Sequence, residues 1–99
     1  MDKKDVYVTI NHLKIFKGEV YLRIGDILTI RKDRMNPYDD EAMAVYDEER
    51  DLKIGYVANS VSTVARGTYS SGRLYDLTDE ECKAEVCFML DERIIAKIL

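Results

Sequence analysis

Residues 31–45 read RKDRMNPYDDEAMAV and contain the end of one strand, a turn and the start of the next strand. The residues that lead into the turn, ILTIRK, alternate apolar and polar side chains, which is typical of a half-buried strand. Asn36 and Pro37 suit the first two positions of a type I turn, because Asn bonds its own backbone and Pro presets φ. The alternation restarts at Ala42. This stretch therefore predicts two strands joined by a tight corner.

Segments with the same period-two pattern lie on both sides of this corner. Together with those already described they are 5–13, 20–24, 27–32, 41–47, 52–57, 83–90 and 93–99, which gives six or seven short strands. Asn59 or Ser60 is suited to cap a short helix that stops at Gly67, and Thr78 is suited to cap a single further turn, whereas 70–72 is expected to form a loop. Strands that are not regularly separated by long helices argue against a parallel sheet. Short antiparallel strands usually close into a small barrel or sandwich, and we favour a barrel.

The better alternating faces also predict which side chains are buried. A 99-residue chain has room for one core, so we expect a single domain over residues 1–99. The predicted core consists of Val8, Ile10, Leu28, Ile30, Val45, Ile54, Val86, Phe88 and Ile94.

Composition restricts the class of protein. Hydrophobic residues make up 46% and charged residues 34%, as in an ordinary globular protein. No apolar run approaches the length of a membrane span or signal peptide, so we expect a cytoplasmic protein that is not embedded in a membrane. The net charge of −4 argues against indiscriminate coating of nucleic acid. The charge is uneven, however, because residues 1–38 carry +3 (8 Lys/Arg, 5 Asp/Glu) and residues 39–99 carry −7 (7 and 14).

Few residues are suited to metal binding or catalysis. Cys82 and Cys87 are five positions apart, so a strand sends their side chains to opposite faces, and His12 is the only histidine. Pro37 and Asp39, followed by Asp51-Leu52-Lys53, loosely resemble a nuclease motif that holds Mg²⁺, but the helices that flank such strands are not predicted. We expect no metal, no cofactor and no enzymatic activity.

Tyr38 is the residue that the turn chemistry leaves unexplained. A type I turn is complete without it, and a purely structural role for the corner remains one interpretation. A tyrosine held beside Arg31, Lys32 and Arg34 offers a stacking face next to cations, which suits a nucleotide. We expect these cations and Lys14 to lie near the rim of one groove that contains the Asn36 turn.

The same residues carry a family resemblance. The sequence is similar to the HIRAN domain in a pattern with two parts. The first part is Asn-Pro-Tyr-Asp, two residues, Ala, an aliphatic residue, one residue and Val. The second part is Ile-Gly-Tyr, about nine residues later. That domain occurs alone in bacteria and at the N-terminus of some DNA-repair helicase-like proteins, and the likeness extends from about Val6 to Ile98. The resemblance implies an OB-like antiparallel β-barrel with one or two short helices. It also implies binding of single-stranded DNA at its 3′ end.

Carried over to this sequence, the resemblance implies specific site residues. Asn36, Tyr38 and Asp39 would line the pocket for the terminal nucleotide, while Tyr56 and Asn59 would make polar contacts to the strand. Lys14, Ile15 and Phe16 match a family segment that is often basic and followed by two aromatics, and Asn59 stands where a basic residue would neutralise a phosphate. With Lys32 at the groove's rim, the predicted nucleic-acid-binding set is Lys14, Phe16, Lys32, Asn36, Tyr38, Asp39, Tyr56 and Asn59.

A second class of function is a protein-interaction or assembly module. The apolar segment RIIAKIL near the chain end is suited to pair with a partner strand. Under the DNA-binding interpretation, the protein partner we consider is a helicase or nuclease. Self-association into a homo-oligomer is compatible with either interpretation.

Overall fold

Six strands and one helix make up the fold in our computed structural model, which describes residues 6–12, 22–60, 62–89 and 93–99. The elements, in chain order, are β1 (Tyr7–His12), β2 (Ile27–Lys32), β3 (Met43–Asp47), β4 (Leu52–Val57), α1 (Ser71–Leu77), β5 (Glu81–Met89) and β6 (Arg93–Ile98).

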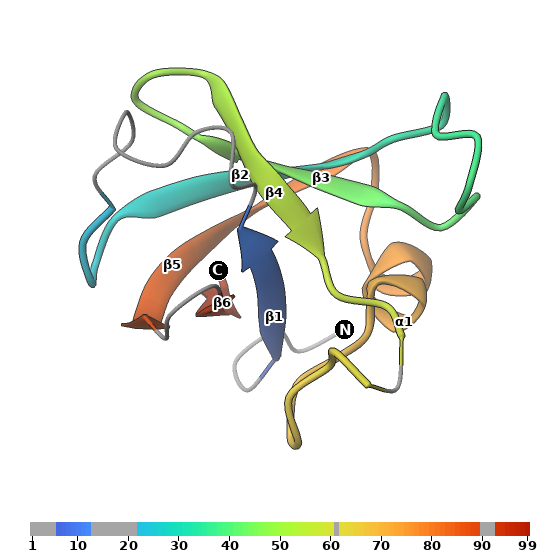
Figure 1. The fold of residues 1–99 in the computed structure, drawn as a ribbon. Helices are drawn as coiled ribbons and strands as arrows, with labels where there is room; N and C mark the ends of the chain where they lie inside the picture. The colour runs from blue at the N-terminus through green and yellow to red at the C-terminus, as the bar shows by residue number, and fades with distance from the viewer. Residues whose placement is uncertain (1–5, 13–21, 61, 90–92) are drawn as a thin grey trace.

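The strands form a closed antiparallel barrel in the order β1-β4-β3-β2-β5-β6 (Figure 1). Closure comes from β1, which pairs with β4 on one side and with β6 on the other. The predicted mainly-β barrel is therefore confirmed. Closure also means that each strand has a neighbour along both edges, which removes the open edge at which sheets aggregate.

The barrel interior holds the core. Eight of the nine predicted core residues are at most 2% exposed: Val8, Ile10, Leu28, Ile30, Val45, Ile54, Val86 and Ile94. Leu74 of α1 is completely buried as well, so the helix closes one end of this core. The alternation of apolar side chains along the strands thus identified the interior.

The prediction for Phe88 was wrong, because its side chain is 60% exposed. The register between β5 and β6 shifts at this point: Val86 pairs with Ala96, but Phe88 pairs with Ile95. Cys87 is the extra residue of this irregularity. Val86 and Phe88 are two positions apart in β5, but their partners, Ala96 and Ile95, are adjacent in β6. Phe88 therefore lies on the outer face with Ile95 instead of on the inner face with Val86.

The helix also lies elsewhere than expected. Residues 62–68 form turns, in which the amides of Thr63 and Val64 both donate to the Ser60 carbonyl at 3.0 Å. The helix is α1, whose N-cap is Ser70, and Thr78 ends it as the C-cap instead of starting a turn. Residues 70–72, predicted as a loop, therefore begin the helix.

Contacts with β1 explain why the segment after β4 does not coil into a helix. Thr9 Oγ1 accepts a hydrogen bond from the Ala65 amide at 3.0 Å and lies 2.8 Å from Thr68 Oγ1. The Tyr69 amide donates to the Tyr7 carbonyl at 2.7 Å. Thr9, on the outward face of β1, is completely buried beneath this segment.

The strand expected at 20–24 is not present in its described part, 22–24. Asp26 Oδ2 accepts the Arg23 amide at 2.9 Å, and the Gly25 amide donates to the Val86 carbonyl at 2.8 Å. Gly25 has a φ of +97°, a conformation that favours glycine, so the chain makes a turn into β2.

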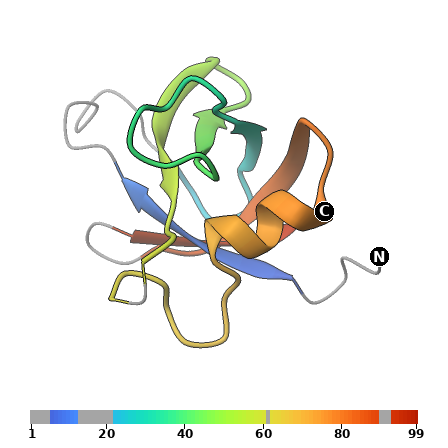
Figure 2. The same cartoon turned by 90° about the vertical axis from the view of Figure 1, so that its right-hand side faces the viewer.

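Three segments meet beside one end of the barrel. They are the β2–β3 loop (33–42), the β4–α1 connection (58–70) and α1, all on the side that faces the viewer in Figure 2. In the parts of the chain that the structure describes, no helix has both the length and the apolar character needed to cross a membrane. The predicted site residues from the Asn36 turn and the end of β4 lie among these three segments.

Candidate functional site

The Asn36 turn is closed by its own side chains. Asn36 Oδ1 accepts hydrogen bonds from the amides of Tyr38 at 2.9 Å and Asp39 at 3.0 Å. Asp39 Oδ1 then accepts the Glu41 amide at 2.9 Å, and the Ala42 amide donates to the Asp39 carbonyl at 3.2 Å. Asn and Asp are favoured in turns because they satisfy backbone donors in this way. The corner is therefore rigid without a ligand.

Asn59 connects this turn to α1. Its Nδ2 donates to Asp39 Oδ2 at 3.1 Å, and its Oδ1 accepts the Gly72 amide at 2.9 Å. The completely buried Ser71 adds a second link, because its hydroxyl donates to the Glu41 carbonyl at 2.6 Å. The amide of Asn59 thus serves as a brace, where the family resemblance led us to expect a contact to the strand.

Tyr38 projects away from the turn. Its side chain is 94% exposed and makes no hydrogen bond or ring contact with any residue that the structure describes. Its backbone, in contrast, is fixed by Asn36. An aromatic ring on a fixed backbone, with its faces open, is suited to stack on a base.

Tyr56 lies on the outside of β4 and reaches the base of the same loop. Its hydroxyl donates to Asp33 Oδ2 at 3.1 Å and lies 3.0 Å from Lys53 Nζ. The hydrogen bond with Tyr56 raises the pKa of Lys53, against the opposing effect of burial. Asp33 is itself tied to the far side of the loop, because its amide donates to the Ala42 carbonyl at 2.9 Å.

The predicted basic rim is divided between different partners. Arg31 lies 3.5 Å from both Asp51 and Glu81, and Asp51 is at the opposite end of β3 from the Asn36 turn. Arg34 pairs with Glu80 through two nitrogens and donates to the Tyr75 hydroxyl at 3.3 Å.

Ionisation within this pair is mutually favoured. The hydrogen bond to Glu80 raises the pKa of Arg34, and the hydrogen bond from Arg34 lowers the pKa of Glu80. More than half of each side chain is exposed to solvent, so the gain in stability is small. A phosphate that binds Arg34 nevertheless competes with a carboxylate already in place.

Lys32 remains available for a phosphate. Its ammonium lies 4.3 Å above the Tyr75 ring, and it forms no ion pair within the described ranges, although its charge is near enough to Glu80 to help lower the pKa of that carboxyl. Lys14 and Phe16, also predicted site residues, lie outside the described residues. The structure thus brings together Asn36, Asp39 and Asn59 directly, with Tyr38 on the same turn, while Tyr56 and Lys32 flank the loop.

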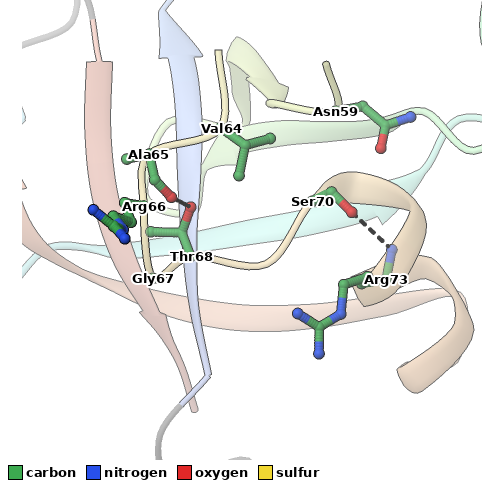
Figure 3. Close-up of a pocket in the computed structure, with 8 residues that line it drawn as sticks. All are labelled: Asn59, Val64, Ala65, Arg66, Gly67, Thr68, Ser70 and Arg73. Atoms are coloured by element: carbon green, nitrogen blue, oxygen red, sulfur yellow. Dashed lines mark hydrogen bonds between the residues drawn. The ribbon is translucent and has the colours of Figure 1, made fainter. Parts of the chain in front are cut away.

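A neighbouring pocket contains residues that sequence reasoning missed. It has a volume of about 400 Å³ and is lined by Asn59, Val64, Ala65, Arg66, Gly67, Thr68, Ser70 and Arg73 (Figure 3). The signal available in the sequence was the absence of Asp and Glu from residue 52 to residue 75, in a protein with 19 acidic residues. Among the described residues, no group of three or more His, Cys, Asp and Glu is placed to hold a metal ion.

Comparison with known proteins shows a family match. The model of the family described as HIRAN domain matches residues 3–87, which is most of the chain. No curated protein and no solved structure matches at the level required of a relative. The match includes the Asn36 turn, Tyr56, Asn59 and α1.

Proposed function

Since the chain belongs to the HIRAN domain family, a family of nucleic-acid-binding modules, we propose that it binds the 3′ end of single-stranded DNA at the Asn36 turn. In this proposal Asp39 accepts a hydrogen bond from the terminal 3′ hydroxyl and Tyr38 stacks on a base. Lys32 supplies positive charge beside the strand. The domain acts by binding and catalyses no reaction.

The observation that carries the proposal is the state of Asp39. Its carboxylate is oriented by the Glu41 amide on one oxygen and by Asn59 on the other. Each carboxylate oxygen accepts about two hydrogen bonds, so each retains capacity for one more donor. A hydroxyl provides such a donor, whereas a terminal phosphate brings negative charge against the carboxylate. Orientation before binding reduces the entropy lost on binding.

An acidic protein needs this kind of recognition to bind DNA. With a net charge of −4, it has too little positive charge to hold long strands by phosphate contacts alone. Hydrogen bonds to charged groups contribute about 1.5–3 kcal/mol each. A pocket specific for the end then supplies the affinity. A role in DNA repair or processing fits this recognition, beside a nuclease that creates ends or a helicase that exposes single strands.

The test is a fluorescence-anisotropy titration with two short single strands of equal sequence, one ending in a 3′ hydroxyl and the other in a 3′ phosphate. We expect the hydroxyl end to bind about tenfold or more tightly, which corresponds to at least about 1.4 kcal/mol. Asp39→Asn should reduce this preference. Equal affinity for the two ends in the unmodified protein would reject recognition of the end.

Asp40→Asn is the matched control. Asp40 is the exposed neighbour of Asp39, and its side chain has no hydrogen bond within the described residues, so the variant makes the same change of charge without touching the proposed contact. Thermal melting of both variants shows whether Asp39→Asn acts through the fold. An end preference that survives in a folded Asp39→Asn protein would assign Asp39 to the turn alone.

The assembly alternative loses its structural basis. It required the segment RIIAKIL to offer a free strand edge, but β6 pairs with β1 on one side and with β5 on the other. A partner strand would have to displace one of them.

A further inference from the structure

The pocket beside the Asn36 turn has features that the proposed contacts do not use. It lies between the β4–α1 connection and the start of α1, and it is lined by two arginines, Arg66 and Arg73 (Figure 3). Neither arginine has an ion-pair partner within the described ranges, whereas Arg31, Arg34 and Arg50 all do. Their charge is therefore available to a ligand.

The surroundings of the pocket favour an anion. The residues that line the pocket include Arg66 and Arg73 but no Asp or Glu, so its wall carries +2 in a protein of net charge −4. Carboxylates lie close by at Asp39, which Asn59 contacts, and at Glu41, beside Gly72. The pocket wall also includes hydroxyl-bearing residues, Thr68 and Ser70. A local positive potential in an acidic protein attracts a negatively charged ligand to this one place.

Arg73 is held in a geometry suited to phosphate. Its guanidinium lies 3.9 Å from the centroid of the Tyr69 ring, which is a close cation–π contact. Tyr69 packs against the core, and its amide is fixed by the Tyr7 carbonyl. A guanidinium held above an aromatic ring keeps the N–H donors in its plane free, and these match two oxygens of a phosphate.

The pocket is continuous with the Asn36 turn through one residue. Asn59 donates to Asp39 and also lines the pocket. We propose that the pocket is a second nucleotide subsite for the same single strand: Arg73 binds an internal phosphodiester, and Arg66, which also lines the pocket, adds positive charge. This inference rests on the proposed function and extends the site beyond the terminal nucleotide.

The experiment compares Arg73→Gln and Arg73→Lys with the unmodified protein. Gln keeps a planar group above Tyr69 but removes the charge, whereas Lys keeps the charge and loses the planar fork. Binding of a ten-residue oligothymidylate with a 3′ hydroxyl is measured between 50 and 200 mM salt, which are about the limits over which phosphate contacts change affinity strongly. Arg23→Gln is the matched control, because Arg23 is exposed and lies beside Asp26, Glu49 and Arg50, none of which lines the pocket.

We expect Arg73→Gln to weaken binding about tenfold and to reduce the slope of log K against log salt by about 0.7. Arg73→Lys should keep the slope and lose part of the affinity. Arg23→Gln should change neither quantity. Thermal melting of each variant confirms that the fold is retained.

The two proposals fail in different ways. If the unmodified protein prefers a 3′ hydroxyl but Arg73→Gln behaves like Arg23→Gln, the subsite is wrong and recognition of the end stands. If the protein binds the 3′-hydroxyl and 3′-phosphate strands equally well but binding depends on Arg73, recognition of the end is wrong and the phosphate contact stands. Absence of any binding by the unmodified protein overturns both.

Discussion

At the scale of single residues, neighbours in the Asn36 turn have opposite tasks. Asn36 is turned inward and accepts two backbone amides, at 2.9 and 3.0 Å, whereas Tyr38 is 94% exposed. Substitutions at these two positions should therefore separate the stability of the fold from the binding of a ligand.

Tyr38→Ala should leave the free energy of unfolding within about 0.5 kcal/mol of the original, because an exposed side chain without contacts contributes little. It should weaken binding of a single strand by about 1–3 kcal/mol, the usual contribution of stacking on one base. Asn36→Ala should instead destabilise the fold by about 1–3 kcal/mol, since two amides lose their acceptor. Urea unfolding and anisotropy titrations measure the two effects. A large loss of stability in Tyr38→Ala would contradict this division.

At the scale of elements, the end of β5 departs from the simple alternation. The register shift between Val86 and Phe88 turns Phe88 to the outside, next to Ile95, while Ile94 stays in the core at 2% exposure. Bulges bend and twist a strand, which assists the curvature of a closed barrel. Phe88 thus lies outside the core, although the alternation of Ala84, Val86 and Phe88 in the sequence predicts that it is buried.

Phe88→Ala should for this reason cost about 1 kcal/mol or less, well below the 3–5 kcal/mol typical of a core phenylalanine. Ile94→Ala is the comparison and should cost about 2–5 kcal/mol, because it leaves a cavity in the barrel. Chemical denaturation of the two variants measures both values. A cost for Phe88→Ala equal to that of Ile94→Ala would place the phenylalanine in the interior.

At the scale of the whole molecule, acidic residues compete with DNA for the cations. Arg31 and Arg34 are paired with carboxylates, while Lys32, Arg66 and Arg73 have no such partner among the described residues. The surface charges therefore divide into pairs that stabilise the fold and cations that are open to a ligand. The Arg34–Glu80 pair belongs to the first group and makes stability depend on pH.

The pKa of Glu80 is lowered from its ordinary value of 4.5, chiefly by the hydrogen bond from Arg34. A carboxyl group whose pKa is lower in the folded state stabilises the fold above pH 4.5, and this contribution disappears as the pH falls through the lowered pKa. Glu80→Gln should then show a smaller loss of stability between pH 6 and pH 3 than the original protein. The difference should be small, because the pair lies on the surface and is screened by solvent. Melting temperatures across this range measure it.

Asp79→Asn is the control for Glu80→Gln. Asp79 is exposed, adjacent in sequence and has no ion pair within the described part of the chain, so the variant removes the same charge without breaking the pair. If both variants change the pH dependence equally, the effect belongs to net charge and not to Arg34.

The sequence alone determined the six strands of the barrel, the corner and the family, although it also predicted a strand at 20–24 that the described residues 22–24 do not form. Alternation over two residues is a local property, so Val8, Ile10, Leu28 and Ile30 identified the interior without knowledge of their partners. The chemistry of the Asn36 turn is also local, because its donors and acceptors lie within a few residues of one another.

Only the tertiary structure decided what depends on distant partners. Thr9 is buried because Thr68 lies over it, Asn59 links Asp39 to Gly72, and Arg34 is occupied by Glu80. The position of the helix follows from the same cause, since contacts with β1 hold the preceding segment in turns. Closure of the barrel brings together segments that are far apart in the chain, and no local pattern records which side chains will then meet. The pocket at Arg66 and Arg73 also depends on distant partners, because its lining segment, residues 59–73, is held by contacts with β1 and with Asp39.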